Sequence, residues 1–233
     1  MPVLLSEAKT AIRERLGEQF AAQWTNPELV RWLNEGIADI ARTAEWYELT
    51  ATIPAVVGTT QYTTTFPYTR VHRCEWLPTG SSQTYPMEWR EMNDMDEVWG
   101  TWQSSSGTPL YFTIWGAPAV AAPTTITFVS FPAPTTAGNF KLYAYGIPVA
   151  LVDTTDDAKA LQIPEGWQSI VYDYVEYMAL RRDRDPRWQE ARAMYERNMQ
   201  TFIRNVESRS DQPGRFTQRP DRSIWRDWDP YSF

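Results

Sequence analysis

The sequence predicts an α+β protein: a helical bundle of N-terminal helices and a C-terminal αα-hairpin, with an inserted β-rich domain and an extended C-terminal tail. Three observations predict this fold class. Apolar residues recur at helical spacing near both ends of the chain, threonine-rich alternation fills the middle, and proline and arginine recur in the last residues. The expected boundaries are 1–46 and 160–208 for the bundle, 47–159 for the insertion and 209–233 for the tail.

The N-terminal helices are predicted from capping signals. Ser6 can cap a first helix over about residues 7–16. Thr25 and Glu28 have the spacing of a capping box, so a second helix begins there. Its apolar residues continue at helical spacing to about residue 45.

The middle of the chain is predicted as strands and turns, because threonine, valine and tyrosine alternate there between prolines and glycines. One helix, at about residues 91–102, interrupts the strands. The expected strands cover residues 47–53, 61–65, 70–77, 83–89, 109–115, 124–131 and 139–146.

Two long helices are predicted after residue 164, separated by Asp185 and Pro186. Their aromatic stripes exceed what one three-helix bundle can bury, in a chain with 12 Trp, 12 Tyr and 9 Phe. Aromatic side chains are enriched at protein interfaces. We therefore expect five aromatic residues to pack between subunits: Trp167, Tyr174, Trp188, Tyr195 and Phe202.

The charge of the chain argues against nucleic-acid binding. The net charge is −7, and affinity for DNA depends mainly on Lys and Arg that neutralise phosphates. The single cysteine, Cys74, excludes an internal disulfide and a cysteine-rich zinc site. No stretch approaches the roughly 20 apolar residues that span a membrane, and no signal peptide is evident. We expect a protein that is made in a cytosol and does not bind specific DNA sequences.

No catalytic constellation stands out. Serine or cysteine nucleophiles usually need a histidine to manage the proton, and the chain has only His72. Strand alternation places His72, Cys74 and Trp76 on one face, where a packed sheet face is favoured over a Cys–His dyad. We therefore predict no enzyme and no cofactor.

The carboxylates at 153–157 (DTTDD) raise the possibility of a calcium site. The segment lacks the glycine and terminal glutamate of an EF-hand loop, so a capping loop is favoured. The acidic segment 93–97 (NDMDE) is expected on the short helix, as a solvated face. We therefore predict no metal site.

Five segments, in this order, carry a family resemblance: ELVRWLNEGIADIARTAEWYEL (28–49), VVGTTQYTTTFPYTRVHRCEW (56–76), GTPLYFTIWG (107–116), FKLYAYGIP (140–148) and LQIPEGWQSIVYDYVEYMALRRDRD (161–185). By these segments the chain resembles the head-to-tail adaptor (connector) proteins of tailed bacteriophages, over roughly residues 25–208. The stretch TTTFPYTR departs from the simpler strand ending usual in that family.

The resemblance implies a structural virion protein at the head–tail junction. It implies a dodecameric ring below the portal that connects capsid to tail, contacts the portal protein and a tail or nozzle protein, and performs no catalysis. Double-stranded DNA would pass through this ring without specific binding. An acidic body suits such a channel, because a basic lining would hold DNA. Asp94, Asp96 and Glu97 are the expected channel-lining residues.

The C-terminal tail is the expected docking segment, on the portal or on a neighbouring subunit. Its arginines can form forked hydrogen bonds with carboxylates, and its aromatic residues can fill pockets of a rigid partner. Prolines keep such a segment extended and lower the entropy lost on docking. The expected contact residues are Arg215, Phe216, Arg219, Arg222, Trp225, Arg226, Trp228, Tyr231 and Phe233.

Other classes of protein remain open. Another tail component, such as a tail terminator or a minor tail protein, is the nearest alternative. A glycan-binding module would explain the Trp and Tyr content but neither the helical hairpin nor the tail. A glycosidase would need two carboxylates flanking a sugar in a cleft.

Overall fold

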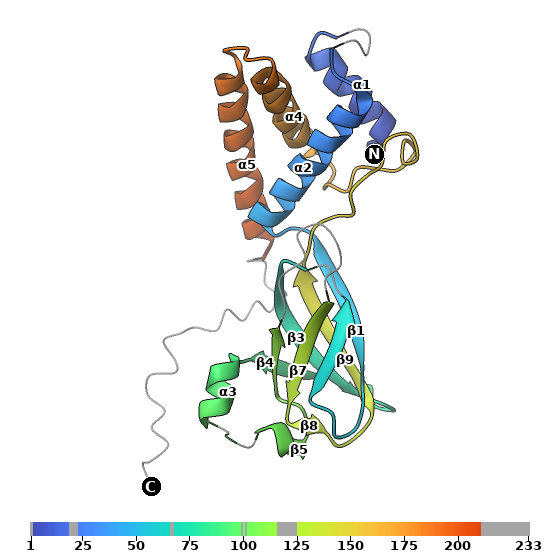
Figure 1. Ribbon diagram of the computed structural model, residues 1–233, viewed down its shortest axis with the longest axis vertical. Coiled ribbons are helices and arrows are strands. Elements are labelled where there is room, and N and C mark those ends of the chain that lie inside the picture. The colour runs from blue at the N-terminus through green and yellow to red at the C-terminus, as the bar shows by residue number, and fades with distance from the viewer. Residues whose placement is uncertain are drawn as a thin grey trace.

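The computed structural model describes residues 2–18, 23–65, 68–98, 100, 102–115 and 125–210. The fold is mixed α+β, as the sequence predicts, with four long helices at one end of the long axis and the strands at the other (Figure 1). In the part of the chain that is described, no helix combines the length and the apolar character needed to cross a membrane.

The long helices come from the two ends of the chain and share one hydrophobic core. We call this part the helical half. Its most buried side chains include Leu5, Leu29, Leu33, Val171 and Phe202, each at most 1% exposed. The helices are α1 (Leu5–Arg15), α2 (Asn26–Ala44), α4 (Gln168–Arg182) and α5 (Trp188–Ser210).

A glutamate three residues after the N-cap satisfies the backbone N–H at the start of both α1 and α2. Thr25 caps α2 as predicted, and its backbone N–H donates to Glu28 Oε2 at 3.0 Å. The cap of α1 is Leu4 rather than Ser6, because Glu7 Oε2 accepts from the Leu4 backbone N–H at 2.9 Å. A glutamate at the third helical position therefore sets where each helix begins.

Within the described residues, the strands form one seven-stranded sheet and one short two-stranded sheet. The order in the large sheet is β1-β9-β3-β4-β6-β7-β2, antiparallel except where β4 pairs with β6. We call the strands and their connections the β-rich half. The strands are β1 (Glu48–Ala55), β2 (Gln61–Thr65), β3 (Arg70–Pro78), β4 (Tyr85–Trp89), β5 (Ser106–Gly107), β6 (Tyr111–Trp115), β7 (Thr125–Phe131), β8 (Ala133–Pro134) and β9 (Gly138–Tyr145).

The large sheet encloses an aromatic core of its own. The rings of Phe128 and Phe140 lie 4.9 Å apart between centroids, as do those of Trp76 and Phe140. Gly138 is needed beside them, since a Cβ there would lie 2.4 Å from both Leu77 O and Trp76 Cη2. The two halves therefore each have a core cluster.

Two further predicted details are wrong. The helix expected at 91–102 is shorter: α3 covers Met92–Val98, and a 3₁₀ turn follows at Trp102–Ser104. His72 does not share a face with Cys74, because the register of β3 against β9 shifts between Val71 and Arg73. This bulge turns His72 outward, while Cys74 stays buried.

The chain returns from the sheet to the helices through a long connection that is bound to α1 and α2. Asn34 on α2 holds it from both sides, because its amide donates to Leu151 O and accepts from Leu151 N, each at 2.8 Å. Further along, the Leu5 backbone N–H donates to Lys159 O at 2.9 Å. The connection thereby becomes part of the helical half.

Candidate interaction surfaces

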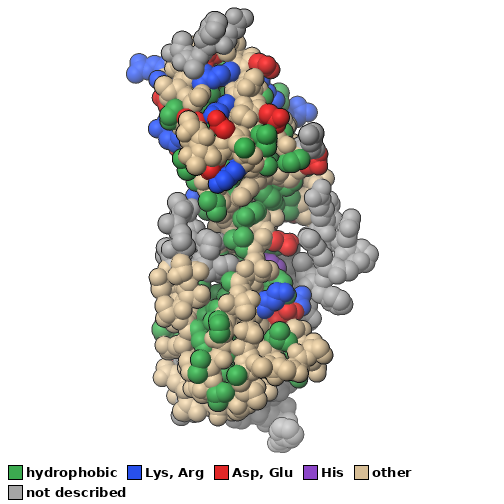
Figure 2. Space-filling model, turned by 90° about the vertical axis from the view of Figure 1, so that its right-hand side faces the viewer, with side chains coloured by type: hydrophobic (Ala, Val, Ile, Leu, Met, Phe, Trp, Pro, Cys, Tyr) green, Lys and Arg blue, Asp and Glu red, His purple; other side chains and the backbone are tan. Residues whose placement is uncertain are grey.

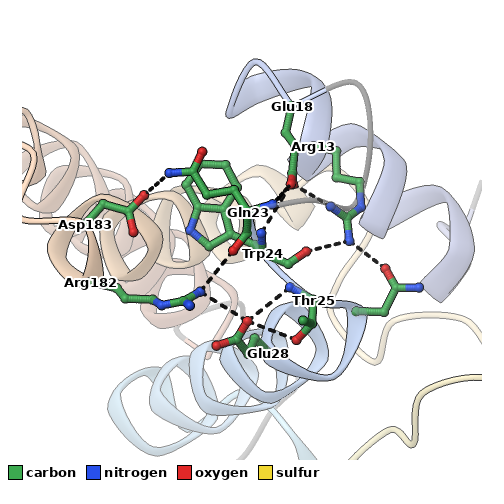
Figure 3. A network of polar contacts seen from close by, with 9 residues as sticks. Arg13, Glu18, Gln23, Trp24, Thr25, Glu28, Arg182 and Asp183 are labelled. Carbon is green, nitrogen blue, oxygen red and sulfur yellow. Dashed lines mark hydrogen bonds and ion pairs between the residues drawn. The ribbon is translucent and has the colours of Figure 1, made fainter.

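A buried ion pair organises the far end of the helical half (Figure 3). Arg13 Nη1 on α1 lies 2.5 Å from Glu18 Oε2, and both side chains are largely buried. Arg13 also donates to Trp24 O and to Asn26 Oδ1, at 3.0 and 2.6 Å. Glu18 Oε1 accepts from the backbone N–H of Gln23 at 2.6 Å. These contacts fix both described ends of the α1–α2 connection.

The same network reaches the turn between α4 and α5 (Figure 3). Arg182 donates to Glu28 Oε2 at 3.1 Å, and Gln23 donates to Asp183. Hydrogen bonds from Thr25 lower the pKa of Glu28, and Arg182 acts in the same direction. The carboxylate that caps α2 therefore also holds the α4–α5 turn.

The α4–α5 turn carries exposed arginines. Arg181, Arg182, Arg184 and Arg187 fall within seven positions, alongside two aspartates. Arg184 has a φ of 57°. Residues other than Gly, Asn and Asp seldom adopt this backbone conformation. Arg187 is paired with Asp185 at 2.7 Å. The turn is an arginine-rich surface of a kind that recognises carboxylates.

The aromatic residues expected at subunit contacts lie mainly inside the helical half. Phe202 and Tyr195 are 1% and 7% exposed and belong to its core. Trp167 packs on Phe202, with ring centroids 5.1 Å apart. Trp167, Tyr174 and Trp188 are partly exposed and retain surface for a neighbour. Subunit packing through the five residues stays a prediction, and it concerns chiefly these three.

Tyr174 and Tyr195 form a ring pair between α2, α4 and α5. Their centroids lie 5.2 Å apart in an edge-on arrangement, and the Tyr195 hydroxyl donates to Asp39 on α2. Burial raises the pKa of Tyr174 to about 12, and Glu35 and Asp39 add to the effect. Burial and the hydrogen bond to Asp39 raise the pKa of Tyr195 as well. Both phenols are therefore neutral at physiological pH.

A cation–aromatic strip covers the outer face of β3 and β9 and was missed from the sequence. Arg70 and Lys141 lie 5.5 and 4.9 Å from the ring centroids of Tyr145 and Tyr143, and the His72 ring stacks on Tyr145 at 4.7 Å. Figure 2 shows basic side chains beside the histidine on this face. The sequence did contain a signal for it, because Lys141, Tyr143 and Tyr145 alternate with buried residues in FKLYAYG (140–146). The strip consists of Arg70, His72, Arg73, Lys141, Tyr143 and Tyr145.

The expected channel-lining residues are exposed on α3. Asp94, Asp96 and Glu97 all have solvent-exposed side chains, whereas Met95 is fully buried against Val129 and Phe131. In Figure 1 this helix projects from one side of the β-rich half. The short helix thus presents its carboxylates outward, and its place in a channel stays a prediction.

The carboxylates at 153–157 bind a lysine. Lys9 Nζ on α1 lies 2.8 Å from Asp153 Oδ1 and 2.5 Å from Asp157 Oδ1. Burial alone would lower the pKa of Lys9, but hydrogen bonds to both aspartates outweigh it and raise that pKa. The ammonium group occupies the position that a cation would take. Among the described residues, no cluster of three or more His, Cys, Asp or Glu could hold a metal ion.

Cys74, the remaining candidate for chemistry, does not form a reactive site. Cys74 is buried against Met87, with sulfur atoms 3.6 Å apart, and burial raises the pKa of its thiol. A thiol with a raised pKa is a poor nucleophile. The docking residues expected between Arg215 and Phe233 lie outside the described residues.

Comparison with known proteins assigns the chain to a family. Residues 4–222 match the model of the SU10 adaptor protein family, which covers both halves of the fold. The chain belongs to this family. Membership agrees with the resemblance to phage head-to-tail adaptors found in the sequence. No curated protein matches the sequence.

Proposed function

We propose that the chain is a structural virion protein that forms a ring below the portal, connects the capsid to the tail and lines the DNA exit channel. The match to the SU10 adaptor family over residues 4–222 carries this proposal. The family places the protein among phage adaptors, and the ring, its twelve copies and its position are our inference. The portal protein and a tail or nozzle protein are the proposed partners.

Both the helical half and the β-rich half have surfaces suited to contacts with other proteins of the proposed ring. We propose residues 1–46 and 160–208 as one helical domain and residues 47–159 as a β-rich domain inserted into it, whose last residues, after β9, lie on α1 and α2. The arginine-rich turn of the helical half and the cation–aromatic strip of the β-rich half both present arginine beside a carboxylate or an aromatic ring. Arginine and tyrosine are enriched at interface hot spots, so we assign contacts between proteins to these surfaces.

The acidic charge supports passage of DNA without binding. The chain carries 29 acidic and 22 basic side chains, and a surface that repels phosphate would let a duplex slide. Exposed Asp94, Asp96 and Glu97 on α3 are the proposed lining residues. At low salt, a gel-shift experiment with duplex DNA should show no binding. Tight binding by the isolated protein would contradict a non-stick channel.

The mass of a complex with portal tests the main proposal. Purified protein mixed with portal rings should give one bound copy for each portal subunit, measured by native mass spectrometry. One copy for each portal ring would refute the ring. Absence of any portal binding, together with binding to purified tails, would favour a tail terminator or minor tail protein instead.

A further inference from the structure

Four described loops meet at the end of the β-rich half that lies farthest from the helices, and none of their residues is charged. The sequence has no charged residue at all from 98 to 140. We call these loops the loop platform. It consists of residues 56–60 (VVGTT), 79–84 (TGSSQT), 104–109 (SSSGTP) and 132–138 (PAPTTAG).

Backbone hydrogen bonds join the four loops into one surface. Gly58 N donates to Pro134 O and Thr79 N to Ala137 O, both at 2.9 Å. Ser106 and Gly107 of β5 pair with β8, within the 132–138 loop. Because the backbone of each loop is bound to the 132–138 loop, the platform is built as a unit and loses little entropy on docking.

The platform is exposed and partly apolar. Val56 and Val57 are 59% and 54% exposed at the β1–β2 turn. Thr136 and Ser82 are exposed on neighbouring loops. On the face drawn in Figure 2, Lys, Arg, Asp and Glu gather over the helices and near the waist, whereas the lower end shows hydrophobic and uncharged side chains.

A surface without charge is unusual for an acidic protein, because charge keeps surfaces soluble and apart. Depletion of charge is instead the mark of the core of an interface. DNA is a poor occupant, since the platform offers no Lys or Arg to its phosphates. A second protein with an uncharged surface fits its chemistry.

We infer that the loop platform is the surface on which the tail-side protein docks, through uncharged contacts. This inference rests on the proposed function, in which one adaptor contacts two different proteins. The tail segment proposed to reach the portal continues from the end of α5, at the level where the helices meet the sheet, and the platform lies at the far end of the β-rich half (Figure 1). The platform is therefore separated, by the length of the β-rich half, from the point at which the proposed portal-binding segment leaves α5.

Single lysines placed in the platform test the inference. Val57→Lys and Thr136→Lys put a charge on exposed loop positions, and Gln189→Lys, at an exposed position of α5, is the matched control. Each protein is assembled on portal rings, and the purified tail-side protein of the same virus is then titrated onto the complex by biolayer interferometry. Melting temperatures show that the variants are folded.

We expect each platform lysine to weaken binding of the tail-side protein about tenfold or more, since an unpaired charge in an interface core is costly. Portal attachment and the Gln189→Lys control should be unaffected, and binding of the unmodified protein should change little with salt. Equal binding by the platform variants, or loss of portal attachment in its place, would overturn the inference. Failure of the unmodified protein to attach to portal would refute the proposed function instead.

Discussion

Gly36 on α2 leaves space for the ring of Tyr174 on α4. A Cβ at Gly36 would lie 2.9 Å from Tyr174 Cδ1 and 3.3 Å from Tyr174 Cβ. The second of these atoms is next to the backbone, so the ring cannot simply swing away. The close approach of α2 and α4 therefore depends on a glycine inside a helix, where glycine itself costs about 1 kcal/mol relative to alanine.

Gly36→Ala should destabilise the protein by about 1–3 kcal/mol, because overpacking outweighs the gain in helix propensity. Urea unfolding measures the change. In a Tyr174→Ala background the same substitution should cost much less, because the ring atoms are gone and only the Cβ contact at 3.3 Å remains. Destabilisation of equal size in both backgrounds would contradict the role of this contact.

Glu18→Ala should lower the free energy of unfolding by about 3 kcal/mol, because it leaves Arg13 buried without its ion pair. Glu35→Ala is the control, since Glu35 pairs with Arg31 in an exposed i,i+4 arrangement worth less than about 1 kcal/mol. Chemical denaturation of both variants checks the difference. Similar losses would mean that the network in Figure 3 is not specific.

Tyr174→Phe should make the protein more resistant to alkali. The folded-state pKa of Tyr174, about 12, lies above the ordinary tyrosine value of 10.0. Its contribution to stability is therefore complete below pH 10 and is lost as the pH rises from 10 to about 12. Because the ring is partly exposed, we expect a difference of about 1 kcal/mol across this window. The free energy of unfolding is measured at several pH values for the unmodified protein and for Tyr174→Phe. If both lose the same free energy between pH 10 and 12, Tyr174 does not contribute to the sensitivity to alkali.

Calcium should not stabilise the protein. Lys9 lies between Asp153 and Asp157 and competes with any cation for their oxygens. The melting temperature should be the same with calcium chloride and with EDTA. A rise of several degrees with calcium would show that the ion displaces Lys9 or binds elsewhere.

Removal of residues 209–233 should leave the protein folded and abolish its attachment to portal. Trp225→Ala with Trp228→Ala should weaken attachment in the full-length chain, since truncated aromatic anchors typically cost about 2 kcal/mol or more. Circular dichroism monitors folding, and co-sedimentation with portal rings monitors attachment. Undiminished attachment of the truncated protein would show that another surface is the anchor.

Local signals in the sequence predicted most of the elements. The capping box at Thr25 and Glu28 placed the start of α2 to within a residue, because both partners lie in the same turn. The predicted strands correspond to the seven strands of the large sheet, with ends that differ by a few residues. Short β5 and β8 were missed, since two-residue strands leave no periodic pattern.

Features that depend on distant contacts could not be predicted. The bulge near His72 arises where β3 pairs with β9, some 70 positions away, and it moved His72 to the outer face. The parallel pairing of β4 with β6 likewise has no local signature. Lys9 joins the aspartates at 153–157 only because the return connection lies on α1. For the same reason, the sequence left a calcium site open as an alternative at a position where the fold supplies an ammonium group.

Two chain segments, side by side, join the helices to the sheet. One leads from α2 into β1 and the other leaves β9, and the Gly146 backbone N–H donates to Tyr47 O at 3.0 Å between them. Glu45 and Arg70 add an ion pair of 2.6 Å at the same level. A single linker would allow the helical half to rotate about it relative to the sheet. Two linkers bound to each other resist torsion and leave bending as the soft motion, so a twist applied to the helices is transmitted to the sheet.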